Sequence, residues 1–176
     1  MSGAISPAIL GPNVSHDPQQ RLDDHALMRR AIELARGSIH SGGGPFGAVV
    51  ARDGMIVAEG QNRVTVWNDP TAHAEVVAIR AACKALDSFQ LEGCTIYSSC
   101  EPCPMCLGAL YWARPARLVF ACTRVDAAQA GFDDELIYLE LPLPVAQRRL
   151  PTITLLRDEG LAAFADWAKA SARRDY

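Results

Sequence analysis

Residues 68–75 read NDPTAHAE and residues 100–106 read CEPCPMC, and these two stretches decide how the fold is interpreted. The first opens with residues typical of a turn and a helix cap, and an apolar-periodic stretch follows it. The second places two cysteines three residues apart, directly after a proline that suits a helix start. We therefore expect two helices that begin close together, one carrying His73 and the other Cys103 and Cys106.

His73, Cys103 and Cys106 are the expected ligands of a zinc ion. A catalytic zinc takes three protein ligands and keeps one position open for water, and one imidazole with two thiolates meets that count. Residues three apart share a helix face, and the positive partial charge at a helix start favours thiolates there. Glu75 would then stand beside the metal without binding it, where a carboxylate can work as a general acid and base.

The cysteines leave other arrangements open. The three cysteines of residues 100–106 share one spacing, so with His73 they could form a closed structural site without room for water. The two residues after Cys100 argue against it, because they place Cys100 at the end of a preceding strand. A disulfide is disfavoured because nothing at the N-terminus resembles a secretion signal. The remaining cysteines are interpreted as small buried apolar residues: Cys83, Cys94 and Cys122.

Composition and charge favour a compact enzyme with a small substrate. The chain has 176 residues, of which 49% are hydrophobic and 21% charged, as is ordinary for one globular domain. Charges and prolines interrupt every apolar run before it reaches the roughly 20 residues that span a membrane, so we expect a cytoplasmic protein. The formal charge of -3 and the lack of a basic stripe make a nucleic-acid substrate improbable.

Periodicity along the chain predicts alternating strands and helices. The first helix is expected to begin near Asp23 or Asp24 and to end around Gly37. The elements expected after it are a hairpin over 45–50 and 55–59, the helix after His73, a strand over 94–98, a helix over 103–113, strands over 118–122 and 153–156, and a helix over 161–168. This order predicts an α/β protein, a three-layer α/β/α sandwich with a mixed five-stranded sheet.

The prolines of residues 1–21 and their lack of a periodic apolar face predict a disordered or loosely packed extension. Residues 22–176 are expected to form a single catalytic domain.

Several segments resemble the cytidine deaminase fold superfamily and, within it, the bacterial guanine deaminases. The likeness runs from about Leu27 to Tyr176 and includes residues 43–48, Gln61 with Asn62, and both metal-binding stretches. The pattern H-x-E with P-C-x-x-C is shared among zinc-dependent nucleobase deaminases. Residues 130–134, which read AGFDD, and Tyr176 sharpen the resemblance to guanine deaminases.

This resemblance implies zinc-dependent hydrolysis of guanine to xanthine and ammonia in a cytidine deaminase-like domain. Glu75 would pass a proton from water to the purine ring, and the resemblance assigns Asp134 to protonate the leaving amine. Asp133 stays open as the alternative for that second role. Two other functions also stay open: deamination of a related aminopurine, a guanine nucleoside or tRNA adenosine, and a non-catalytic zinc-stabilised binding module.

Purine binding requires flat apolar walls and polar contacts at the ring edge. Phe46 and Trp112 are candidates for stacking, and Asn62 can both donate and accept hydrogen bonds. Phe46 could instead be a core residue, as aromatic side chains commonly are. Ala74, between the expected ligand and the acid/base, and Tyr176 complete the candidate substrate contacts.

Residues 139–145 read LELPLPV, and their prolines predict an extended connector that cannot enter a central strand. The connector could carry residues 145–176 onto a neighbouring subunit, and the guanine deaminases that the chain resembles are domain-swapped dimers. Tyr176 would then reach the purine pocket of the partner. A tail that covers its own sheet is the alternative.

Overall fold

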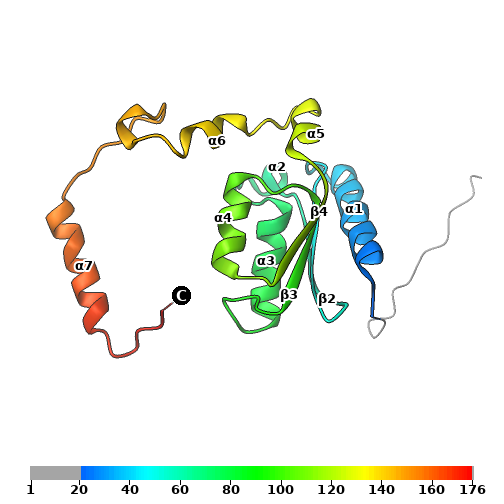
Figure 1. The fold of residues 1–176 in the computed structure, drawn as a ribbon, viewed down its shortest axis with the longest axis horizontal. Helices are drawn as coiled ribbons and strands as arrows, with labels where there is room; N and C mark the ends of the chain where they lie inside the picture. Colours follow the sequence, from blue (N-terminus) through cyan, green and yellow to red (C-terminus); the bar gives the residue numbers. More distant parts are fainter. Residues whose placement is uncertain (1–20, 176) are drawn as a thin grey trace, which may run out of the picture.

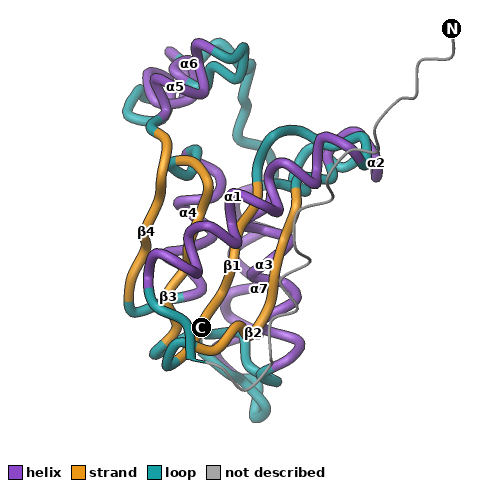
Figure 2. The backbone as a smooth tube through the Cα atoms, turned by 90° about the vertical axis from the view of Figure 1, so that its right-hand side faces the viewer, coloured by secondary structure: helices purple, strands orange, loops and turns teal. Residues whose placement is uncertain are grey.

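The computed structural model describes residues 21–175, and they contain a mixed sheet of four strands (Figure 2). The strands lie in the order β2-β1-β3-β4 and span Gly47–Arg52 (β1), Met55–Gln61 (β2), Cys94–Cys100 (β3) and Arg117–Cys122 (β4). β1 pairs antiparallel with β2 and with β3, whereas β3 and β4 run parallel. The predicted hairpin and the two following strands are confirmed, and their boundaries differ from the expected ones by one or two residues.

Helices cover both faces of this sheet, as Figure 1 shows. α1 (Asp24–His40) packs on one face, where Leu27, Ala31 and Tyr97 belong to one apolar cluster. α3 (Ala74–Ala85) and α4 (Pro104–Ala113) cover the other face over a second cluster that includes Ile96. The three-layer α/β/α prediction is therefore confirmed.

α1 begins at Asp24, where its start was expected, and Asp23 caps it. Asp23 accepts a hydrogen bond from the Ala26 amide at 2.7 Å, which satisfies a backbone donor that the helix itself cannot. The helix continues past the expected stop at Gly37 and ends at His40. Gly37 stays helical beside the Gln61 side chain, whose amide nitrogen donates to the Leu34 carbonyl at 3.0 Å.

The fifth strand is not confirmed within the described residues. Residues 151–156 have no strand assignment and lead directly into α7 (Arg157–Lys169). A strand requires a neighbouring strand to pair its backbone groups, and this segment lies away from β4 in Figure 1. The predicted last helix is confirmed, but it begins four residues earlier than expected.

Residues 133–138 have a helix-like pattern, which α6 (Glu135–Glu140) confirms. Other short helices occupy segments that the sequence pattern did not resolve: α2 (Val64–Trp67), α5 (Arg124–Gln129) and a 3-10 helix, η1 (Val145–Gln147). The expected connector over 139–145 is therefore only partly extended, because its first two residues close α6. Helices of three to six residues carry little periodicity, so most of them cannot be predicted from pattern alone.

Gly60 on β2 allows α3 to approach the sheet closely. A Cβ atom at this position would overlap the Ala74 carbonyl oxygen and lie 2.6 Å from the Ala78 amide nitrogen. Because both atoms belong to the backbone of α3, glycine is required for this contact. The contact fixes the first turn of α3, which carries the residues of the functional site.

Residues 1–20 and Tyr176 lie outside the described part of the chain, so the N-terminal extension and the position of Tyr176 remain predictions. Among the described helices, none combines the length and apolarity needed to cross a membrane.

Candidate active site

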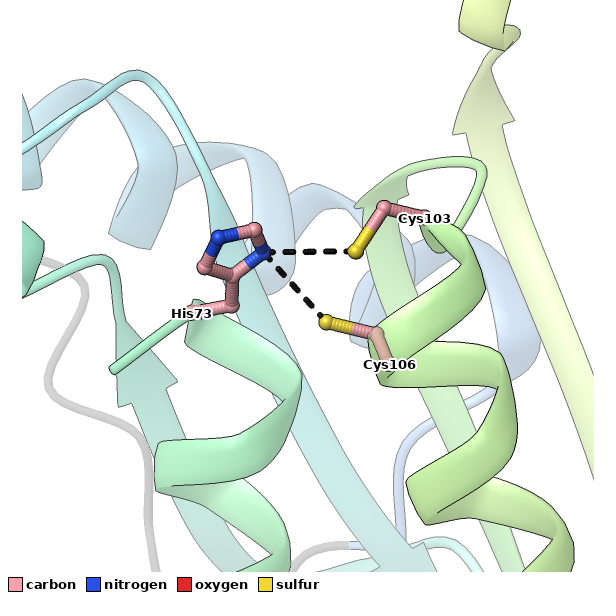
Figure 3. A group of neighbouring side chains, drawn as sticks. All are labelled: His73, Cys103 and Cys106. Carbon is pink, nitrogen blue, oxygen red and sulfur yellow. Dashed lines mark hydrogen bonds between the residues drawn. The ribbon is translucent and has the colours of Figure 1, made fainter. Parts of the chain in front are cut away.

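His73, Cys103 and Cys106 meet where two helices begin, as Figure 3 shows. His73 is the residue before α3, Cys103 is the residue before α4, and Cys106 lies in the first turn of α4. The His73 Nδ1 atom lies 3.5 Å from the Cys103 sulfur and 3.4 Å from the Cys106 sulfur. All three potential ligand atoms lie within 4.8 Å of one another.

These distances fit a tetrahedral zinc ion. Bonds of about 2.3 Å to sulfur and about 2.0 Å to nitrogen, at a tetrahedral angle, separate nitrogen and sulfur by roughly 3.5 Å. The observed separations of 3.4 and 3.5 Å match that requirement. Three ligands also leave the fourth position that a catalytic site needs.

The surroundings of the two thiols shift their pKa values in opposite directions. A hydrogen bond with Cys106 lowers the pKa of Cys103 to about 4, and the same bond, together with burial, raises the pKa of Cys106. Zinc binds thiolates, so metal binding would favour deprotonation of both cysteines.

Cys100 stands apart from this cluster. It is the last residue of β3, and its thiol lies 3.4 Å from the Thr123 carbonyl oxygen. Among the described residues, the group of side chains able to hold one metal comprises His73, Cys103 and Cys106, without Cys100. The geometry therefore favours an open three-ligand site over a closed four-ligand one.

Glu75 is buried beside the cluster. One carboxylate oxygen accepts a hydrogen bond from the Ser98 hydroxyl at 3.2 Å, and the other lies 3.5 Å from the Cys106 sulfur. Burial raises the pKa of Glu75 because desolvation disfavours its charged form. A carboxyl group with a raised pKa exchanges protons more readily near neutral pH, which suits a general acid and base.

A cavity of about 440 Å³ opens beside these residues. Its lining includes His73, Glu75 and Cys103 at one end, with Phe46 and Asn62 from the segments around the hairpin. Residues 132–134 and Ile137 border it from the chain after β4. The volume lies within the range typical of pockets for small molecules.

Asn62 presents its amide group with a defined orientation. Its side-chain oxygen accepts from the Gly44 amide at 3.2 Å and from the Val64 amide at 3.3 Å. These two backbone donors assign the oxygen, so the NH₂ group is left to serve as a donor toward the cavity. Asn62 is thus suited to donate to a carbonyl or ring nitrogen.

Phe46 forms an apolar wall of the cavity together with Phe132. Their ring centroids lie 4.9 Å apart at an interplanar angle of 87°, an edge-to-face arrangement that aromatic pairs favour. Phe46 also packs against the apolar cluster under α3 and α4. The structure thus gives Phe46 both positions that the sequence left open, at the edge of the core and in the pocket.

The two adjacent aspartates differ in their surroundings. The Asp133 carboxylate accepts a hydrogen bond from the Glu135 amide at 2.9 Å, whereas within residues 21–175 no other residue donates to the Asp134 carboxylate. Burial and the charge of Cys103 raise the pKa of Asp134. Asp134 is therefore the better placed of the two to exchange a proton in the cavity.

Comparison with known proteins places this site in a family. The pattern described as the cytidine and deoxycytidylate deaminase zinc-binding region matches residues 21–122. The chain belongs to this deaminase family. The match includes both helix starts that carry the ligand cluster, so the cofactor of the family, zinc, is the metal that the cluster fits.

Guanine deaminases are among the similar members of this deaminase family. The guanine deaminase of Bacillus subtilis is 50% identical over 156 residues, which cover 88% of this chain and all of that protein. Its X-ray structure superposes with a TM-score of 0.86. The guanine deaminase from Nitrosomonas europaea is 30% identical over 92% of this chain, with a TM-score of 0.64.

A second group of similar deaminases is related over a smaller part of the chain. The tRNA-specific adenosine deaminase of Haemophilus influenzae is 40% identical over 117 residues, which cover 63% of this chain and 68% of that protein.

The other expected substrate contacts of this deaminase are not all at the cavity. Ala74 is fully buried in the cluster under α3. Trp112 is exposed and lines a groove with Val76 and Ile79 of α3. Within one chain the structure does not bring Trp112 to the cavity, because six residues of helix turn its side chain away from Cys106.

Residues of the deaminase site that the sequence did not predict include Ser98, Glu101 and Arg124. Ser98 orients Glu75, and the other two line the cavity. The alternation along β3 places Ser98 on the same face as Ile96 and Cys100. That alternation was the available signal, but it does not reveal a partner 23 residues away.

Proposed function

We propose that this chain deaminates guanine to xanthine and ammonia in a zinc-dependent hydrolysis. The observation that carries the proposal is the position of Glu75, buried within 3.5 Å of a metal ligand at the end of a cavity sized for a small molecule. The 50% identity to a guanine deaminase over most of the chain supports guanine as the substrate.

His73, Cys103 and Cys106 would hold the zinc ion, which when bound supplies a water whose pKa is lowered toward about 7. Glu75 would accept a proton from the attacking water and deliver it to the ring nitrogen next to C2 of guanine. The hydrogen bond from Ser98 keeps one Glu75 oxygen oriented while the other takes part in the transfer.

Asp134 would complete the proton transfers. The departing amine must leave as neutral ammonia, so the exocyclic nitrogen has to gain a proton before its bond to C2 breaks. Two observations support this role. The pKa of Asp134 is raised, and no other residue within 21–175 donates a hydrogen bond to its carboxylate.

The purine would lie between apolar walls and be recognised at its edge. Phe46 and Phe132 provide aromatic surface on one side, and the free NH₂ group of Asn62 can donate to an acceptor on the ring. Ala74 would contribute backbone contacts only, because its side chain is buried in the core.

Other substrates of this deaminase family are less well supported. The tRNA-specific adenosine deaminase matches a smaller share of the chain at lower identity, and the net charge of -3 does not favour a polyanion. A non-catalytic zinc module gives no reason for a buried carboxylate beside the ligands, because burial of Glu75 costs free energy.

A substrate panel tests the proposal. The zinc-loaded full chain is incubated with guanine, guanosine, adenine, cytosine and a tRNA anticodon stem, and ammonia release is measured for each. Guanine is expected to give the fastest release. Release from adenine or the tRNA stem alone would assign the site to a different deaminase class.

The chain is also proposed to form a domain-swapped homodimer through residues 145–176. α7 stands away from the sheet in Figure 1, and Phe164 is 73% exposed although it is a large apolar side chain. Exposed apolar surface on a terminal helix favours docking on a second copy. In that arrangement Tyr176 would reach the partner's purine pocket.

The six cysteines all lie in the described part of the chain and are free thiols, which supports a reducing compartment and hence the cytoplasm.

Light scattering and a deletion test the dimer. A dimer mass is expected, and deletion of Tyr176 should raise the Michaelis constant for guanine without releasing zinc. A monomer in solution would contradict the swap, and unchanged kinetics after the deletion would contradict the contact with substrate.

A further inference from the structure

α6 carries Asp134 at its start but has few contacts that hold it in place. The helix spans six residues, and none of them is buried in the described chain. Its start is positioned by the ring of Phe132, which meets Phe46. A second contact is needed to fix the direction of the helix, because one ring pair allows rotation about the contact.

Arg124 is placed to make that second contact. It is the first residue of α5, and its backbone amide donates to the Glu101 carboxylate at 3.0 Å. Thr123 and Asp126 form a capping box around it, with the Thr123 amide donating to Asp126 at 2.8 Å. The start of α5 is thus attached to the loop that leads to Cys103.

The side chain of Arg124 crosses from α5 to α6. Its guanidinium carbon lies 4.5 Å from the centroid of the Tyr138 ring, a distance typical of a cation–π contact. Tyr138 follows Asp134 by four residues, so both side chains lie on the same face of α6. Arg124 and Asp134 both line the cavity.

We propose that Arg124 is a positioning residue that holds Asp134 over the cavity by stacking on Tyr138. The chain of contacts runs from the metal-binding loop through Glu101 to Arg124, then across to Tyr138 and along one turn of α6. The kinetic consequence of this inference rests on the proposed guanine deamination, but the structural consequence does not.

The test compares single and double variants of the full zinc-loaded chain. The substitutions are Arg124→Gln, Arg124→Lys, Tyr138→Leu, Tyr138→Phe and the pair Arg124→Gln with Tyr138→Leu. Two quantities are measured: steady-state kinetics on guanine, and hydrogen exchange of the backbone amides in α6. One such amide is that of Ile137, which donates to the Asp134 backbone carbonyl at 3.0 Å. Zinc content and circular dichroism verify that each variant is folded.

Arg124→Gln and Tyr138→Leu are each expected to lower kcat roughly 2- to 30-fold. This is the factor in rate that corresponds to the free energy of one cation–π contact. The Michaelis constant should change little, and amide exchange in α6 should accelerate in both variants. Lysine at 124 and phenylalanine at 138 should retain most of the wild-type values, because they preserve a cation over a ring. The double variant should be no worse than the worse single variant.

Multiplicative losses in the double variant would overturn the proposal, since Arg124 would then act independently of Tyr138, for instance by touching the purine. Unchanged exchange in α6 for Arg124→Gln would also overturn it. A wild-type chain that is inactive on guanine, but whose α6 exchanges faster after Arg124→Gln, would refute the proposed function and leave the positioning role intact.

Discussion

The Ser98 hydroxyl on β3 donates a hydrogen bond to the Glu75 carboxylate on α3 at 3.2 Å, and both side chains are buried. The bond joins the central sheet to the helix that supplies the acid/base and a metal ligand. Because Ser98 sits on a strand paired on both edges, its hydroxyl has little freedom to move. Glu75 is consequently held in one orientation before any substrate binds.

Replacing Ser98 with alanine should lower turnover about 10-fold or more while zinc remains bound. A hydrogen bond to a charged group contributes about 1.5–3 kcal/mol, and 1.4 kcal/mol corresponds to a factor of ten in rate. Ser99→Ala is the matched control, because Ser99 accepts from the Gly47 amide at 3.1 Å and faces away from Glu75. Equal losses of kcat in the two variants would contradict the orienting role.

Cys103→Ser and Cys106→Ser should each lose most of the zinc, whereas Cys100→Ser should keep the wild-type zinc content. The reason is that the sulfurs of Cys103 and Cys106 and the His73 ring nitrogen lie close enough to bind one metal ion. Cys100 does not belong to this cluster of potential ligands. Zinc per folded chain is measured by atomic emission after gel filtration. Loss of zinc from folded Cys100→Ser would instead indicate a closed four-ligand site.

Asp134→Asn should reduce kcat by about 10² or more, because an amide cannot deliver the proton that the leaving amine needs. Asp133→Asn serves as the control, since asparagine can still accept from the Glu135 amide and preserve the local backbone. Steady-state rates of ammonia release provide the comparison. If the Asp133 variant lost more activity than the Asp134 variant, the two roles would have to be exchanged.

Gly60→Ala should destabilise the protein by about 1–3 kcal/mol, the usual cost of forcing extra volume into a packed interface. The added Cβ would overlap backbone atoms of α3 at Ala74 and Ala78, which cannot yield as a side chain would. Gly108→Ala in α4 is the control, because an added Cβ there meets nothing within 4 Å and the helix should gain about 0.5–1 kcal/mol. Urea unfolding of the zinc-loaded chains measures both changes. Equal stability of wild type and Gly60→Ala would show that α3 can shift without cost.

The sequence was sufficient to predict the parts of the fold that repeat a strong local signal. The helix start near Asp23 or Asp24, the hairpin turn and the ligand spacing of Cys103 and Cys106 each have a short-range physical cause, and the structure contains all of these elements. α5 is too short for such a signal, and the positions of α5 and α6 depend on contacts between distant residues.

The candidate site could be predicted where the chemistry depends on residue type and spacing. The roles of His73 and Glu75 were predicted from one sequence motif. Ser98 is an ordinary strand residue in the sequence, and only the fold brings it to Glu75. Trp112 stays a prediction, because within the described residues it lines a groove with Val76 and Ile79 and is not among the residues that line the cavity. The fifth strand was expected from its apolar run, which cannot indicate whether a pairing partner lies in the same chain.

The proposed mechanism depends most on Glu75, which would transfer the proton in a zinc-dependent deamination of guanine. The most direct measurement is xanthine formation from guanine by the wild-type chain and by Glu75→Gln at equal zinc content. The wild type is expected to form xanthine, and the rate of the variant should be lower by about 10² to 10⁴, because glutamine cannot shuttle a proton. A Glu75→Gln chain that binds zinc and forms xanthine at the wild-type rate would show that Glu75 does not transfer the proton.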